Sequence, residues 1–180
     1  AAVDTLLTDE RVQSISFVGS TAVGEYIYET GCAHGKRVQA LCGAKNHMVV
    51  MPDADMDQVV DSIMGAAYGS AGERCMAVSV VVAVGDDTAD EMISLLKPRI
   101  AALKVGAYNQ QGAEMGPVVT PDARDRIRGY INRGVEAGAE LVVVGPDIKL
   151  PGHSYGCFVA ASVLHTVATA KTNYHHAILC

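Results

Sequence analysis

Cys75 stands in a sequence setting that suits covalent catalysis. It follows Arg74 directly, within the Gly- and Ser-rich stretch GSAGERCMA at residues 69–77. Small residues on its N-terminal side would let a substrate approach, and the adjacent guanidinium would favour the thiolate, which is the nucleophilic form of cysteine. Most free cysteines are instead buried and inert. The residues around Cys75 therefore leave two interpretations open, a nucleophile or a packed side chain.

A second candidate site is the Gly-Ser-Thr run that follows the β-rich residues 14–18. Ser20 or Thr21 is suited to capping a helix that we expect to end near Thr30, with Gly31 just past its end. A strand, a small-residue turn and a helix together present backbone N–H groups and a hydroxyl to a phosphate. The motif is weak on its own, and a plain strand-to-helix turn is the alternative.

Alternating strand and helix patterns must position these two stretches. The cysteine is predicted to lie between a helix at 52–68 and a strand at 78–84, whose unbroken apolar run indicates burial on both faces. Strands that alternate with helices predict an α/β fold, with a mostly parallel sheet flanked by helices. The other expected strands are 36–41, 48–51 and 141–144, and the other expected helices are 88–104 and 121–137. No element is assigned from Ala160 onward.

Composition narrows the classes of partner. The chain has 180 residues, a formal net charge of −6 and 49% hydrophobic residues. This acidic balance argues against nucleic acid or an anionic membrane as a partner, and no apolar run is long enough to span a bilayer. The five cysteines form no CxxC pair and the histidines are dispersed, so we expect reduced thiols and no metal site. No signal-peptide pattern opens the sequence, which we expect to be an internal segment of a longer protein.

Three motifs, taken together, carry a family resemblance. FVGSTxxG at 17–24, GAKNHxVVMPDAD at 43–55 and GSAGERCMA at 69–77 resemble the aldehyde dehydrogenase superfamily, and most closely its CoA-acylating branch, which oxidises methylmalonate semialdehyde. The similarity extends as far as Phe158 and Val159. It implies the end of a Rossmann-type NAD-binding domain at 1–41 and an incomplete catalytic domain at 42–180. It also implies a bacterial cytoplasmic or mitochondrial matrix enzyme, which is a homo-oligomer at full length.

The resemblance assigns roles to individual residues. Cys75 would attack the aldehyde carbon of a methylmalonate or malonate semialdehyde. Hydride transfer to NAD would leave a thioester on its sulfur, CO2 would be lost, and coenzyme A would remove the propionyl or acetyl group. Arg74 would grip the substrate carboxylate, with a structural ion pair as the alternative role. Gly19 and Ser20 would bind the pyrophosphate of NAD, and the peptide around Cys42 would lie near the nicotinamide.

Three neighbouring residues are expected to have structural rather than chemical roles. Glu73 is more easily explained as a structural charge than as a base. Lys45 and Asn46 are expected to hold the turn at 42–46 together.

Leu41 marks the main departure with a chemical consequence. Hydrolytic aldehyde dehydrogenases carry a glutamate at this position, where it activates water, and leucine cannot accept a proton. A thioester on Cys75 would therefore have no general base from Leu41 and would persist until the thiol of CoA attacked it. The CoA-acylating branch also lacks this glutamate.

Other departures lie in the tail, and they support a rival interpretation. The family pattern GPTLF is replaced by AASVL at 160–164, and a glutamate that holds the nicotinamide ribose aligns with Ala177. The rival is a folding fragment without catalysis, because an oxyanion-hole asparagine and a second arginine would precede Ala1. A third possibility, a cysteine-dependent acyl transferase or esterase, needs a base beside Cys75.

Overall fold

The computed structural model describes residues 2–144 and 156–165. The chain forms two compact units, Ala1–Ala44 and Lys45–Cys180. The predicted domain boundary fell after Leu41, and the assignment of the two units to cofactor and catalysis stays a prediction.

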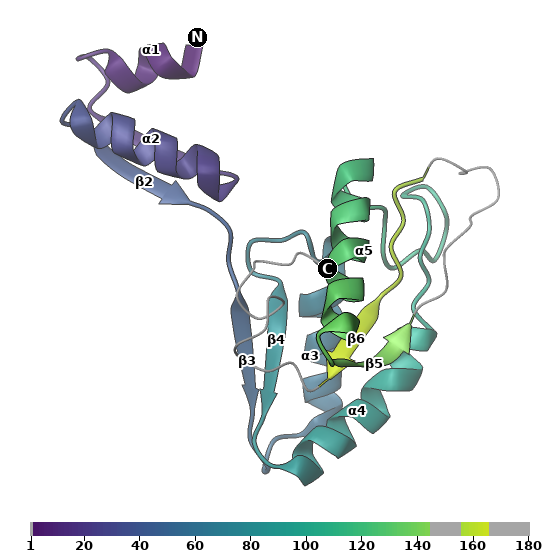
Figure 1. The fold of residues 1–180 in the computed structure, drawn as a ribbon. Helices are drawn as coiled ribbons and strands as arrows, with labels where there is room; N and C mark the ends of the chain where they lie inside the picture. The colour runs from purple at the N-terminus through teal and green to yellow at the C-terminus, as the bar shows by residue number, and fades with distance from the viewer. Residues whose placement is uncertain (1, 145–155, 166–180) are drawn as a thin grey trace. The chain divides into compact units, whose positions relative to one another are not determined.

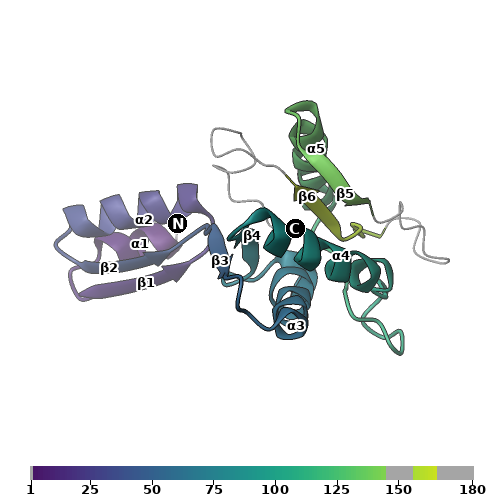
Figure 2. The same cartoon turned by 90° about the horizontal axis from the view of Figure 1, so that it is seen from below.

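The first unit is a parallel strand pair with helices packed on it (Figures 1 and 2). Its elements are α1 (Ala2–Thr8), β1 (Ser14–Val18), α2 (Thr21–Ala33) and β2 (Arg37–Leu41). β1 and β2 pair in register from Ser14 opposite Arg37 to Val18 opposite Leu41. Leu7 of α1 and Ile27 of α2 form its buried apolar contacts. Val18 and Leu41, the strand ends that precede the candidate residues Gly19, Ser20 and Cys42, therefore lie at the same edge.

Helix α2 is longer than the sequence predicted. It continues to Ala33, so Gly31 lies inside the helix and not beyond its end. Gly31 is buried, and a Cβ on it would lie 2.6 Å from Cγ2 of Val38 on β2. The glycine that we interpreted as a stop signal instead permits close packing of the helix on the sheet.

The second unit begins with a parallel pair, β3 (Asn46–Val50) and β4 (Val78–Ala83), joined through α3 (Met56–Tyr68) and a 3₁₀ turn, η1 (Gly69–Gly72). Figure 1 shows these strands side by side. Helices α4 (Asp86–Ala101) and α5 (Pro121–Glu136) follow, and then β5 (Glu140–Val144) and β6 (Ser162–His165). β5 and β6 pair antiparallel, so the described strands form three two-stranded sheets, two of them parallel. The sequence had suggested no element after Ala160, where β6 lies.

The core of the second unit is formed by the apolar faces of its helices and by the strand side chains that they cover. α3 contributes Val60 and Ile63, α4 contributes Leu96 and Ile100, and α5 contributes Ile127. These positions recur at helical spacing, which is why the periodicity predicted all three helices.

Two local predictions in this unit were wrong. β4 is not buried on both faces, because Ser79 is exposed and Val82 is 42% exposed. Helix packing covers one face of the two-stranded pair, and the other stays open within the described residues. Helix α3 starts at Met56 and not at Pro52, since the carboxylate of Asp55 accepts a hydrogen bond from the backbone N–H of Gln58 and caps the helix there.

The described residues contain neither a candidate membrane span nor a candidate metal site. No helix in residues 2–144 and 156–165 is both long enough and apolar enough to cross a membrane. The same ranges contain no cluster of three or more side chains suited to holding a metal ion. The loop predicted at 145–154 and the aligned tail position Ala177 lie outside the described residues, as does residue 155.

Candidate active site

Cys75 occupies a tight turn between η1 and β4. The backbone N–H of Ala77 donates to the carbonyl of Arg74 at 3.0 Å and closes this turn around Cys75 and Met76. The Cys75 side chain is exposed, and Met76 is 80% exposed. Of the two interpretations that the sequence left open, the buried and inert cysteine does not hold. The structure leaves an accessible thiol at the end of α3 and η1.

The residues that lead into this turn have an unusual backbone. Ser70, Ala71 and Gly72 are all in the left-handed region, with φ of 54°, 55° and 72°. Left-handed residues other than glycine are disfavoured by about 1–2 kcal/mol each, and such strain clusters at functional sites. Ala71 is buried and packs in the core, so its surroundings hold the conformation in place. The approach to Cys75 is therefore a fixed backbone shape and not a flexible glycine-rich loop.

The side chain of Arg74 turns back over the start of this segment. Its Nε donates to Oγ of Ser70 at 3.1 Å. A Cβ on Gly69 would lie 2.8 Å from Nη1, so the absence of a side chain there makes room for the guanidinium. No described residue accepts a hydrogen bond from the two terminal nitrogens of Arg74. That end of the guanidinium fork is free to pair with a carboxylate.

Two further side chains tie the cysteine turn to its surroundings. Nδ2 of Asn46, the first residue of β3, donates to the carbonyls of Cys75 and Ala77, both at 2.9 Å. Oε2 of Glu73 accepts the backbone N–H of Val119 at 3.1 Å. Glu73 thus has the structural contact that we expected. Asn46 was expected to hold the turn at 42–46, and its side chain holds the cysteine turn instead.

In the Gly-Ser-Thr turn of the first unit, the hydroxyl of Ser20 does not cap the helix that follows. Ser20 is the N-cap of α2, with φ of −67° and ψ of 149°, but its side chain makes no capping hydrogen bond. Thr21 does not cap the helix either, because its Oγ1 accepts the backbone N–H of Gly43 at 3.3 Å. The predicted side-chain cap is therefore absent. The first backbone N–H groups of α2 and the Ser20 hydroxyl remain available to an anion.

Cys42 and Leu41 lie at the end of β2, at the same edge as this turn. The backbone N–H of Gly19 donates to the carbonyl of Leu41 at 3.1 Å and joins the two strand ends. The sulfur of Cys42 occupies the space that a side chain on Gly24 would need, so the thiol packs against α2. Leu41 is 52% exposed. The structure therefore turns the Cys42 thiol inward and leaves the Leu41 side chain accessible.

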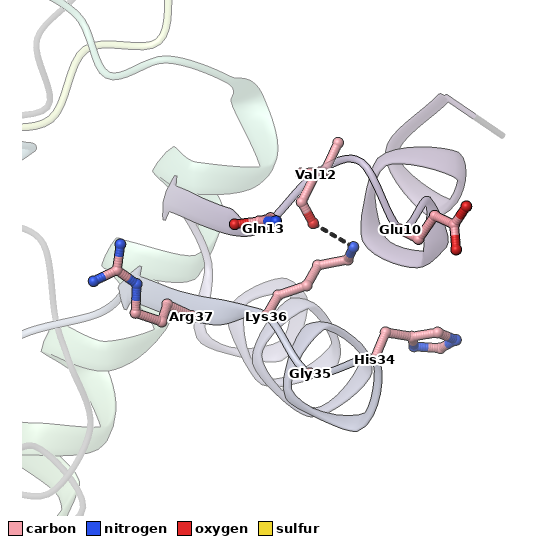
Figure 3. Close-up of a pocket in the computed structure, with 7 residues that line it drawn as sticks. All are labelled: Glu10, Val12, Gln13, His34, Gly35, Lys36 and Arg37. Atoms are coloured by element: carbon pink, nitrogen blue, oxygen red, sulfur yellow. Dashed lines mark hydrogen bonds between the residues drawn. The ribbon is translucent and has the colours of Figure 1, made fainter.

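A shallow pocket at the opposite edge of the same strand pair has a different character (Figure 3). The ammonium group of Lys36 donates to the carbonyls of Asp9 and Val12, each at 2.6 Å, which closes the α1–β1 connection. Hydrogen bonds from Arg11 hold the pKa of Asp9 below its usual value. Ligands of parallel sheets bind at the carboxyl ends of the strands, and this pocket lies at the amino ends. None of the predicted site residues lines this pocket. The residues that line it are Glu10, Val12, Gln13, His34, Gly35, Lys36 and Arg37.

Asn46 is the residue whose contact the sequence analysis missed. Asparagine is depleted in strands, yet it is the first residue of β3, whose last three residues are apolar. That mismatch was the available signal. The sequence contained no indication that the partners of its carboxamide lie 29 and 31 residues further along.

Comparisons with known proteins agree with the motifs. The sequence profile of the "Aldehyde dehydrogenase family" matches residues 1–178, which extends the similarity beyond Val159. A "Malonate-semialdehyde dehydrogenase" of Pseudomonas aeruginosa is 54% identical over 98% of this chain and 36% of its own length. The bovine mitochondrial "Methylmalonate-semialdehyde/malonate-semialdehyde dehydrogenase [acylating]" is 42% identical over 98% of this chain and 33% of its own length.

A solved structure gives the same result for the fold. A protein from Sinorhizobium meliloti, assigned as a methylmalonate-semialdehyde dehydrogenase and complexed with NAD, superposes with a TM-score of 0.95 at 48% identity. The superposition covers 99% of this chain and 36% of that protein. The chain thus spans about a third of the length of the curated relatives described here.

Proposed function

The chain belongs to the aldehyde dehydrogenase family, and we propose that the whole protein oxidises methylmalonate or malonate semialdehyde and transfers the acyl group to coenzyme A. The main observation behind this proposal is that Cys75, at the position of the family's nucleophile motif, is exposed in a turn that Asn46 holds by hydrogen bonds. The similarity to relatives named for these semialdehydes supports the substrate class.

The proposed chemistry begins at the sulfur of Cys75. Its thiolate adds to the aldehyde carbon and forms a thiohemiacetal. Arg74 binds the carboxylate of the same substrate with the terminal nitrogens that no described residue uses, and Ser70 holds the other side of the guanidinium. Binding the carboxylate in this way orients the aldehyde carbon for attack. In the thioester that hydride removal would leave on Cys75, the carboxylate is lost as CO2 and the α-carbon takes up a proton. The thiol of CoA then attacks the acyl carbonyl carbon, and Cys75 leaves as the thiolate.

The first unit fits a dinucleotide cofactor. Gly19 and Ser20 follow the carboxyl end of β1, the hydroxyl of Ser20 makes no cap, and the first turn of α2 presents its N–H groups there. Cys42 follows the end of the neighbouring strand β2. NAD, when bound, would supply the hydride acceptor that converts the thiohemiacetal into a thioester. On this proposal, residues 1–41 contribute to the cofactor site and residues 42–180 to the catalytic domain.

The residue type at position 41 supports acyl transfer to CoA rather than to water. Hydrolytic relatives carry a glutamate at this position, and leucine has no atom that can take a proton. We propose an enzyme of the bacterial cytoplasm or the mitochondrial matrix, in keeping with the bacterial and mitochondrial relatives, and a homo-oligomer at full length.

The test measures NADH formation by the whole protein with and without CoA. With Leu41 intact, omission of CoA should leave a single-turnover burst followed by a slow steady rate. Leu41→Glu should raise the CoA-independent steady rate, because a general base within reach of water contributes about 10²–10⁴-fold. Rapid CoA-independent turnover with Leu41 in place would show that another base acts, and would overturn the acylating assignment.

Leu6→Glu is the matched control for the new carboxylate. Leu6 is 55% exposed on α1, close to the 52% of Leu41. This variant should leave the CoA dependence unchanged. A CoA-independent rate that rises equally in both variants would mean that added charge, and not a placed base, opens the water pathway.

The competing possibility concerns the chain of 180 residues by itself. It covers only about a third of its relatives, so it carries an incomplete set of their elements. A folding fragment of this kind would form the turns described above and produce no NADH with any semialdehyde. Comparison of the isolated chain with the whole protein under the same assay separates the two.

A further inference from the structure

We propose that Asn46 is a positioning residue that fixes the backbone on the C-terminal side of the nucleophilic Cys75. This inference rests on the proposed function, since it concerns how the same site works. Asn46 binds neither substrate nor cofactor in the proposal. It acts through the two carbonyls that accept its hydrogen bonds.

The chemistry of the contact sets the orientation of the carboxamide. Both partners are backbone carbonyl oxygens, at 2.9 Å each, and only the NH2 end of an asparagine side chain can donate to two acceptors. Two hydrogen bonds from one rigid planar group hold the carbonyls of Cys75 and Ala77 at a fixed separation. The turn cannot rotate about its ends without breaking at least one of them.

The turn and the asparagine together hold both peptide groups that flank Cys75. The carbonyl of Arg74, in the preceding peptide group, accepts the N–H of Ala77. The carbonyl of Cys75, in the following one, accepts from Asn46. Each peptide group is planar, so φ and ψ of Cys75 are both restrained. The rotation about Cα–Cβ is then the remaining torsion that sets the direction of the sulfur.

An irregularity in the strand pairing supplies the register that this contact needs. Asn46 pairs with Val78, but the next residue, His47, pairs with Val80, so Ser79 is an extra residue on β4. Bulges of this kind redirect side chains and are common beside active sites. Because Val78 directly follows Ala77, the register brings Asn46 to the point where the cysteine turn enters β4.

Glu73 provides an internal comparison. Its carboxylate binds the N–H of Val119, on the N-terminal side of the turn, and it does not contact the peptide groups of Cys75. If any tether of the loop were sufficient, Glu73 and Asn46 variants would behave alike. The geometry points to Asn46 as the tether that determines where the sulfur lies.

The experiment uses the whole enzyme with Asn46→Asp, which keeps the shape but replaces the donor with an acceptor that faces two carbonyls. We expect kcat for the semialdehyde to fall by about 10²-fold, the scale expected when a reacting atom is displaced by about 1 Å. KM should change by less than about threefold, because the carboxylate contacts of Arg74 are not altered. Asn46→Gln, which retains the carboxamide, should recover part of the loss.

Two further measurements separate positioning from a general loss of folding. Amide exchange at Ala77 should become at least about 10-fold faster in Asn46→Asp, while the thermal midpoint shifts little. Asn132→Asp makes the same substitution at an exposed position of α5 and should change neither quantity. Glu73→Ala should change kcat much less than Asn46→Asp does.

Three outcomes would overturn the inference. They are an unchanged kcat in Asn46→Asp, a lower kcat with unchanged exchange at Ala77, and equal effects of Glu73→Ala and Asn46→Asp. If the unmodified whole enzyme oxidises no semialdehyde, the proposed function fails, and the exchange comparison then tests the Asn46 contact independently of activity.

Discussion

The turn at 19–24 and the turn at 69–77 are both short and rich in small residues, but they differ in how strongly hydrogen bonds and backbone conformation constrain them. The first has a hydroxyl that makes no cap, in Ser20, and unremarkable backbone angles there. The second has left-handed Ser70 and Ala71, a closed hydrogen-bonded turn and two side-chain tethers. A group that binds a ligand by hydrogen bonds can lack a hydrogen-bond partner until the ligand arrives. A nucleophilic atom must already be oriented toward the carbon that it attacks.

Removal of the proposed nucleophile, Cys75, should have the largest effect on activity. In the whole enzyme, Cys75→Ser should lower semialdehyde-dependent NADH formation by at least about 10³-fold, because a hydroxyl without a base is a poor nucleophile. Cys32→Ser is the control, since Cys32 is also an exposed free cysteine, in the last turn of α2. If Cys32→Ser proved as damaging as Cys75→Ser, the contrast between the two turns would have no chemical meaning.

The next effect concerns the guanidinium held by Ser70. Arg74→Leu should lower kcat/KM for methylmalonate semialdehyde by about 30–150-fold relative to propanal, because a charge-assisted contact to a carboxylate contributes about 2–3 kcal/mol. Arg126→Leu, at an exposed position of α5, should leave the ratio unchanged. Equal losses for both substrates would assign Arg74 a purely structural role in the cysteine turn.

The smallest effect on activity should come from a substitution in the turn at 19–24. Ser20→Ala removes one hydroxyl that makes no helix cap, so we expect no loss of stability and an increase of about fivefold in KM for NAD, the cost of one hydrogen bond. Ser62→Ala on the exposed face of α3 is the control. A lower thermal midpoint without a change in KM would show that Ser20 is structural and that the two turns differ less than proposed.

Local sequence patterns predicted much of the fold correctly. β1 was predicted with the bounds it has, and the helices α3, α4 and α5 were predicted within a few residues of their ends. Apolar periodicity and capping residues are local signals, so a single sequence contains them. The small residues before Cys75 predicted an accessible thiol, and the Cys75 side chain is exposed.

The errors arose where tertiary packing decides. The residue at position 31, inside α2, is a glycine because a side chain there would collide with Val38. No local pattern distinguishes such a glycine from one that ends a helix. Val82 is exposed because it lies on the face of the β3–β4 pair that no described helix covers, and an apolar run in the sequence cannot indicate this. The partners of Asn46 are equally remote in sequence. Contacts across 29 or more residues depend on strand register, which is set by the whole unit.

The close contact between Gly24 and Cys42 within β1–α2–β2 has a consequence for synthesis of the chain. All three elements lie within residues 14–41, and the second strand pairs with the first as soon as the intervening helix packs. Chains emerge from the ribosome N-terminus first, and compact units fold as they appear. The turn proposed to bind phosphate can thus form while most of the second unit, which contains Cys75, is still being synthesised.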